Sequence, residues 1–217
     1  MVRAILFDLG NVLVSFEERK EVIARIVRAH NGNVDAAASL FSKGDGEAPY
    51  EALDTGQMNA KKLWWAVCTK GRIKQRKLPF HIFVMLYAMY LKPLPESVEV
   101  AGELGQRYQL VAVSNGDFGS RFVVSLLKVN HGISFLRSFI SSECGVRKPQ
   151  LIDRACDVLL REHGIHREEC IYIDDMYQYV VAAKKLGLQA IQYHGLKESP
   201  HQLRSRLWKA GVELACS

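Results

Sequence analysis

Residues 2–13 have the sequence VRAILFDLGNVL, in which a short apolar run stops at one carboxylate, Asp8. This pattern predicts a buried strand that delivers Asp8 to its carboxyl end. Two later apolar runs, 110–113 and 171–173, end in polar residues in the same way. The carboxyl edge of an open parallel sheet is where ligands bind. The polar residues that we expect at this edge are Asp8, Ser114, Asn115, Asp174 and Asp175.

The length and composition predict a globular protein with a sizeable core. A chain of 217 residues fits one domain, or one domain with an insertion. Hydrophobic residues make up 48% and charged residues 24% of the chain, which argues against disordered and fibrous classes. No apolar run approaches the ~20 residues that a membrane helix needs, and the first apolar run is too short for a signal peptide. We therefore expect a cytoplasmic protein with no membrane partner.

Neither the cysteines nor the net charge indicates a zinc site or a nucleic-acid partner. The five cysteines form no CxxC pair and have no histidine partners at zinc-finger spacing, which favours free thiols in a reducing compartment. The net charge is +6, and the densest basic cluster lies at residues 70–77, without interleaved aromatic residues. That cluster favours a solvated surface, with at most some steering of anionic substrates, so we expect no nucleic-acid partner.

The strand signals divide the chain into an α/β core and an inserted helical region. Residues 15–94 carry helical patterns and no convincing strand, and the stretch 80–90 is apolar almost all round, which predicts a buried helix. The alternation of strands and helices then resumes. We expect a core made of residues 1–14 and 95–217, with a helical cap at 15–94. Two further strands of the core are expected at 138–141 and 189–193.

Four motifs, present in order, make the chain resemble the haloacid dehalogenase superfamily. They are Phe7-Asp8-Leu9-Gly10-Asn11-Val12-Leu13, Ser114-Asn115 after an apolar strand, Gly145-Val146-Arg147-Lys148-Pro149, and Asp174-Asp175 followed by Ala182, Ala183 and Gly187. Within that superfamily, the chain resembles the phosphatase-like branch of bacterial glucose-1-phosphatases and the N-terminal domains of soluble epoxide hydrolases. The resemblance implies a Rossmann-like parallel sheet with a helical cap inserted after the first strand. It covers the core, whereas the cap resembles the family only in its position and helicity.

The resemblance implies a covalent mechanism with a metal cofactor. Asp8 would attack a substrate phosphorus to give an aspartyl-phosphate, which water then cleaves. Because a carboxylate and a phosphate dianion repel each other, the reaction needs a cation, and Mg²⁺ is the implied cofactor. The implied ligands are Asp8, the backbone carbonyl of Gly10 and Asp175, with Asp174 as an outer or alternative ligand.

The resemblance also implies which groups bind the phosphoryl group. Lys148 is expected to pair with both the nucleophile and the phosphoryl group as a compact point charge. Ser114 and the backbone amides of Asn115 and Gly116 are expected to donate hydrogen bonds to the phosphoryl oxygens.

Two positions depart from the family pattern. Most phosphatases of the superfamily carry a second Asp two positions after the nucleophile, as general acid and base, and this chain has Gly10 there. Positioned proton transfer contributes ~10²–10⁴-fold, whereas enzymatic hydrolysis of phosphate monoesters gains up to ~10²¹-fold in total, so the loss is survivable. Tyr179 stands where the family often has Asn or Asp, which predicts weaker hydrogen-bond support around the metal.

The residues leave three functions open. The first is a Mg²⁺-dependent phosphatase for a small phosphorylated metabolite such as a sugar phosphate, working as a monomer or homodimer. A haloacid dehalogenase would use the same aspartate on carbon without a metal, although the Asp174–Asp175 pair makes sense mainly with a cation. A catalytically weak binding or scaffold protein is the third, favoured by Gly10 and Tyr179. Aromatic residues of the cap that are candidates for a substrate pocket are Phe41, Tyr50, Trp64 and Trp65.

Overall fold

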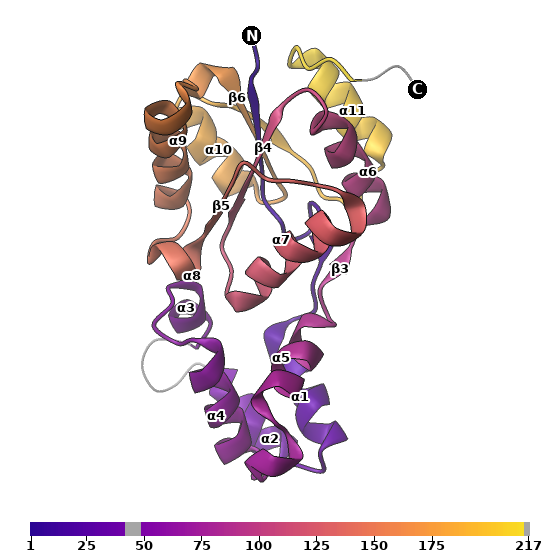
Figure 1. Cartoon of the computed structure of the whole chain (residues 1–217), viewed down its shortest axis with the longest axis vertical. Coiled ribbons are helices and arrows are strands. Elements are labelled where there is room, and N and C mark those ends of the chain that lie inside the picture. Colours follow the sequence, from indigo (N-terminus) through magenta and orange to yellow (C-terminus); the bar gives the residue numbers. More distant parts are fainter. Residues whose placement is uncertain (42–48, 215–217) are drawn as a thin grey trace.

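The computed structural model describes residues 1–41 and 49–214. Figure 1 shows two parts along the long axis, an α/β part that contains the N-terminal strand and a helical lobe at the opposite end. The lobe is inserted between the first strand of the central sheet and the helix α6 (Pro95–Leu104). This arrangement gives the α/β fold that the sequence predicts.

Five parallel strands form the central sheet, in the order β5-β4-β1-β6-β7. β1 takes the middle position because its four residues are apolar and fully buried on both faces. Each strand lies within one or two residues of its predicted position. The strands are β1 (Ala4–Phe7), β4 (Gln109–Ser114), β5 (Arg137–Ile140), β6 (Cys170–Asp174) and β7 (Gln189–Gln192).

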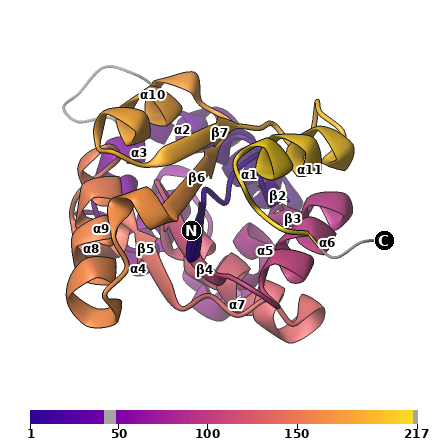
Figure 2. The same cartoon turned by 90° about the horizontal axis from the view of Figure 1, so that it is seen from above.

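Helices cover both faces of this sheet (Figure 2). Successive side chains of a strand point to opposite faces, so Ile5 and Phe7 enter one apolar cluster and Ala4 and Leu6 enter the other. The first cluster is closed by α6, α7 (Phe118–His131) and α11 (Pro200–Lys209), and the second by α9 (Gln150–His163) and α10 (Tyr177–Lys185). The short elements of this part are α8 (Ser141–Cys144) and η3 (Arg167–Glu169).

The helical lobe has an apolar cluster of its own. The predicted amphipathic repeat Val22, Ile23, Ile26 and Val27 supplies its centre and is buried. Its elements are α1 (Arg19–Ala29), α2 (Val34–Ala38), η1 (Ser39–Phe41), α3 (Pro49–Asp54), α4 (Ala60–Lys70), η2 (Gln75–Lys77) and α5 (Phe80–Ala88).

Two connections join the lobe to the sheet, and they run side by side. The short strands β2 (Val14–Ser15) and β3 (Lys92–Pro93) pair in antiparallel fashion. The expectation that residues 15–94 hold no strand is therefore wrong at both ends of this segment. Two-residue strands carry too little periodicity to be visible in the sequence.

The prediction that the apolar segment 80–90 forms a buried helix is only half right. α5 does form, and Phe83 and Tyr87 are buried, but Met85 is 52% and Met89 63% exposed. α5 packs against α1, α4 and α7. The face of α5 that carries Met85 meets solvent.

The remaining expectations about composition concern cysteines, charge and membranes. Cys68, Cys156 and Cys170 are buried free thiols and Cys144 is half-buried and free, whereas Cys216 lies outside the described residues. The lysines and arginines of residues 70–77 are exposed, as predicted for a solvated surface. Within residues 1–41 and 49–214, no helix has the length and apolarity to span a membrane.

Candidate active site

The carboxyl ends of β1 and β6 bring three carboxylates together. Asp8 follows β1, Asp174 ends β6, and Asp175 comes next. One carboxylate oxygen from each lies within 4.8 Å of those of the other two. Asp8 and Asp174 are buried, whereas Asp175 is half-buried. The acids that the sequence places at one sheet edge therefore do meet there.

Lys148 lies between the two buried acids. Its Nζ is 3.1 Å from Oδ2 of Asp8 and 2.7 Å from Oδ2 of Asp174, and its side chain is only 2% exposed. Burial alone would lower the pKa of Lys148, but the attraction of Asp8 and Asp174 outweighs it, so the pKa is raised. Lys148 therefore stays protonated and supplies a buried positive charge beside the acids.

The carboxyl of Asp8 is held in place but is costly to ionise. Its Oδ1 accepts a hydrogen bond of 2.7 Å from the backbone N–H of Leu9. Burial raises the pKa of Asp8 from 3.8 to about 6; Lys148 opposes this effect and Asp174 adds to it. A buried carboxyl with a raised pKa, next to a cation and two further acids, is typical of a functional site.

Asp174 is fully engaged with protein donors. Its Oδ1 accepts a 2.8 Å hydrogen bond from the backbone N–H of Met176, and its Oδ2 accepts bonds from Lys148 and from the Tyr172 hydroxyl. In contrast, the side chain of Asp175 accepts one hydrogen bond from the described residues, of 3.0 Å, from the Asn11 amide. Asp8 and Asp175 therefore have more free lone pairs for a cation than Asp174 has.

The turn after β1 brings Asn11 to the site. Asn11 adopts a φ of 55°, and its backbone N–H donates to the carbonyl of Val14 at 2.7 Å. Asparagine tolerates this left-handed conformation better than most residues. Asn11 is part of the first sequence motif, but its contact with Asp175 depends on the fold of the turn and was not predicted.

Asn115 and Tyr179 hold the segment that carries Lys148. The Asn115 side chain accepts a 2.8 Å hydrogen bond from the backbone N–H of Lys148, and its amide donates to the Tyr179 hydroxyl at 3.1 Å. The Tyr179 ring lies 4.6 Å from Nζ of Lys148, in cation–π distance. Tyr179 therefore supports the lysine, a role that the sequence did not indicate.

The predicted phosphate-binding groups lie next to the acids, at the end of β4. Ser114 is buried, and its hydroxyl has no hydrogen-bond partner in the described part of the chain. The backbone N–H of Gly116 donates to Oγ of Ser141 at 2.9 Å, so this amide already has a protein acceptor. A Cβ at position 116 would come within 1.9 Å of Oγ of Ser120, so a larger residue there would require the Ser120 side chain to turn away.

A cavity of about 450 Å³ lies between the sheet edge and the helical lobe. Leu9, Gly10 and Ser114 form one wall, and Tyr50 and Tyr87 of the lobe form another. Of the four aromatic candidates, Tyr50 alone lines the cavity. Phe41 and Trp64 pack inside the lobe, and Trp65 is 58% exposed.

Phe16 covers Gly10, where the family usually has its second Asp. A Cβ built on Gly10 would lie 2.6 Å from Cε1 of the Phe16 ring. Phe16 follows β2 and is itself 51% exposed, so it lies at the cavity mouth with room to turn outward.

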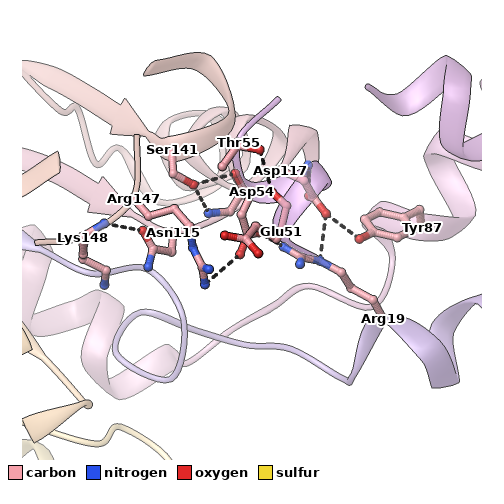
Figure 3. Close-up of polar contacts among 12 residues, drawn as sticks. Arg19, Glu51, Asp54, Thr55, Tyr87, Asn115, Asp117, Ser141, Arg147 and Lys148 are labelled. Atoms are coloured by element: carbon pink, nitrogen blue, oxygen red, sulfur yellow. Dashed lines mark hydrogen bonds and ion pairs between the residues drawn. The ribbon is translucent and has the colours of Figure 1, made fainter. Parts of the chain in front are cut away.

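An ion network along the cavity wall joins the lobe to the sheet edge, and its two acids, Asp54 and Asp117, are buried (Figure 3). Arg19 of α1 contacts Asp54 of α3 at 2.6 Å and Asp117, before α7, at 3.0 Å. The Tyr87 hydroxyl donates to Asp117 at 2.6 Å, and Arg147 approaches Asp54 at 3.4 Å. Burial lowers the pKa of Arg19, but the acids outweigh it and keep the guanidinium charged. These partners are far apart in sequence, and none was predicted.

Several solved structures share this fold. A haloacid dehalogenase (HAD) family enzyme from Bacteroides thetaiotaomicron, in complex with magnesium and inorganic phosphate, has a TM-score of 0.70 at 16% identity, over 94% of this chain and 100% of that chain. A predicted HAD-like family hydrolase from Porphyromonas gingivalis has a TM-score of 0.69 at 20% identity, over 96% and 98%. A 2-haloacid dehalogenase from Pseudomonas syringae pv. Tomato has a TM-score of 0.65 at 16% identity, over 96% and 99%. At these identities the likeness shows the fold alone.

The sequence itself matches a family model over most of its length. That model describes haloacid dehalogenase-like hydrolases and covers residues 2–187. No curated protein matches the sequence. The resemblance to the glucose-1-phosphatase and epoxide hydrolase branch stays a prediction. The four motifs and the matched residues lead to one conclusion, that the chain belongs to the haloacid dehalogenase-like hydrolases.

Proposed function

We propose that this hydrolase is a Mg²⁺-dependent phosphatase that cleaves a small phosphate monoester through an aspartyl-phosphate on Asp8. The observation that carries the proposal is the charge balance at the sheet edge. Three carboxylates converge there, and Lys148 is the one cation in ion-pair contact with them among the described residues. Adjacent carboxylates repel unless a cation is bound, so the cluster favours a divalent metal.

The donor set fits Mg²⁺, which prefers hard oxygen ligands such as carboxylates and carbonyls. Asp8 and Asp175 have free lone pairs, and we propose that they hold the ion with the backbone carbonyl of Gly10. Asp174 would act as an outer ligand, because it already binds Lys148 and Tyr172. When bound, the ion would neutralise charge between Asp8 and the phosphoryl oxygens.

The reaction at Asp8 divides into two displacements. An ionised carboxylate oxygen of Asp8 attacks the phosphorus, the ester P–O bond breaks, and the leaving alkoxide takes a proton from water. Water then attacks the aspartyl-phosphate and releases inorganic phosphate. Lys148 stabilises the ionised Asp8 and the transferring phosphoryl group, and Ser114 would donate its free hydroxyl to a phosphoryl oxygen.

The dehalogenase alternative has a specific obstacle in the cavity. A haloacid carries a carboxylate that needs a positive partner. Among the described residues, Arg19 is the one arginine or lysine that lines the cavity, and it is already paired with Asp54 and Asp117. A protein with only a binding or scaffold role would not use the buried carboxyl of Asp8 in a reaction.

Phosphate release from a panel of monoesters, with and without Mg²⁺, tests the proposal. We expect turnover that needs Mg²⁺ and is lost in Asp8→Asn. Asp35→Asn is the matched control, because Asp35 is exposed on α2 and is not one of the residues that line the cavity. Full phosphate release in excess chelator, or an unchanged rate in Asp8→Asn, would refute the mechanism. Metal-independent release of halide from a 2-haloacid would establish the dehalogenase.

A further inference from the structure

Resting on the function proposed above, we propose that the alcohol released from the substrate carries no second anionic group and is neutral and partly apolar. The feature behind this proposal is the charge pattern of the cavity beside Asp8. In residues 1–41 and 49–214, the cation that lines the cavity wall is already paired with acids of the chain.

Arg19 is the single lysine or arginine that lines the cavity in the described chain. Its Nη2 lies 2.6 Å from Asp54 and its Nε 3.0 Å from Asp117, and the two carboxylates are 9% and 6% exposed. Tyr87 also donates to Asp117. A substrate anion could bind Arg19 only by displacing one of these buried carboxylates, which would then lose its charge partner. Arg19 is therefore not available to a second anionic group.

The other charged residues of the wall are acidic. Glu17 and Glu18 line the cavity; Glu17 pairs with Arg25, and Glu18 has no ion pair among residues 1–41 and 49–214. With Asp54 and Asp117, the wall carries four acids. The cations that line it or pair with these acids are three, namely Arg19, Arg25 and Arg147. A second anion would meet like charge here, whereas a neutral group would not.

The rest of the wall is apolar or aromatic. Val14, Val22 and Leu91 line it together with the tyrosines. Two of these rings already face cations of the chain, because Arg19 lies 5.5 Å from the Tyr50 ring and Arg25 lies 4.7 Å from the Tyr90 ring. The rings are therefore less available to a cationic substrate group. What remains exposed suits the carbon skeleton of a neutral alcohol.

Aryl esters of one ring test this directly. With Mg²⁺ present, we compare kcat/KM for phenyl phosphate, 4-carboxyphenyl phosphate and 4-(trimethylammonio)phenyl phosphate. The carboxylate makes the phenol a slightly better leaving group, so chemistry alone would favour that ester. We expect it nevertheless to react about tenfold more slowly than phenyl phosphate, because the cavity offers it no free cation.

Two variants each remove the charge of one carboxylate that pairs with Arg19. Asp117→Asn keeps a residue type that caps helices well, at the start of α7, and Asp54→Asn acts from the lobe. We expect each to raise the carboxyphenyl-to-phenyl ratio about fivefold, whereas Asp35→Asn leaves the ratio unchanged. Equal rates for both esters in the wild type, or an unaltered ratio in both variants, would overturn the proposal. A preference for the trimethylammonio ester tenfold beyond the gain that its more acidic phenol gives in the uncatalysed reaction would replace a neutral leaving group by a cationic one.

A separate readout distinguishes this proposal from the proposed function. If no ester is hydrolysed, the phosphatase fails, and the cavity is then tested by calorimetry with phenylphosphonate and 4-carboxyphenylphosphonate, which cannot be cleaved. About tenfold weaker binding of the carboxylated probe supports the charge pattern, and equal binding refutes it.

Discussion

Replacing Asp8 by Asn in the metal-free protein tests which of two opposing effects on the charge of this carboxyl is larger. Burial and Asp174 disfavour its charge, whereas Lys148 favours it. The pKa of Asp8 rises from 3.8 to about 6. Because a pKa difference of one corresponds to ~1.4 kcal/mol, ionised Asp8 lowers the free energy of unfolding by about 3 kcal/mol above pH 6. Asn keeps the shape and the acceptor for Leu9. We therefore expect Asp8→Asn to raise the free energy of unfolding at neutral pH by up to ~3 kcal/mol.

The pH dependence follows from the sign of the shift. Between pH 3.8 and about 6, the folded state keeps the Asp8 proton while the unfolded chain loses it. The stability that Asp8 contributes is therefore complete below pH 3.8 and is lost as the pH rises through about 6. The variant and the wild type should differ little below pH 3.8 and by the full amount above pH 6.

Urea denaturation in chelator and in Mg²⁺ measures both effects. Bound Mg²⁺ should reverse the order, because a ligand at 1,000 times its Kd adds ~4.1 kcal/mol to the wild type and less to a variant that has lost one ligand. Asp35→Asn serves as the surface control, with no comparable pH dependence. If Asp8→Asn is less stable than the wild type at neutral pH without metal, the attraction of Lys148 outweighs burial and the reasoning fails.

Two further predictions concern Gly10 and Tyr179. Without an acid at position 10, kcat/KM should depend steeply on leaving-group pKa, so that aryl phosphates and sugar 1-phosphates react faster than alkyl phosphates; a wild-type rate insensitive to leaving-group pKa contradicts this. Gly10→Asp should flatten the slope more in the Phe16→Ala background, because the Phe16 ring lies 2.6 Å from the new Cβ. Tyr179→Phe removes the hydroxyl that accepts from Asn115 but keeps the ring over Lys148. Tyr179→Phe should lower kcat about fivefold, because one hydrogen bond is worth ~1 kcal/mol. Tyr179→Leu, which also removes the ring, should lower kcat further. A wild-type kcat in both variants would show that Tyr179 does not support Lys148.

The sequence predicts the sheet and its acids because both signals are local. An apolar run of strand length that ends in an acid describes a buried strand and its tip within about eight residues. Three such tips, from β1, β4 and β6, must meet when the strands are neighbours in a parallel sheet. Asp8 and Asp174 are therefore found from the sequence, and Lys148 is found through its motif.

The cavity could not be predicted, because its walls come from segments that the chain brings together only on folding. Arg19 and Asp117 are almost one hundred positions apart in the sequence, and nothing near Arg19 indicates that partner. Tyr179 shows the same limit, since its position beside the acidic pair suggested lost hydrogen-bond support, whereas the fold places its ring over Lys148. Under the proposed function, the motifs specify the chemistry at the phosphorus, and we propose that long-range ion pairs decide which alcohol fits beside it. Substitutions in the network around Arg19 should therefore alter selectivity among esters before they alter the dependence on Asp8.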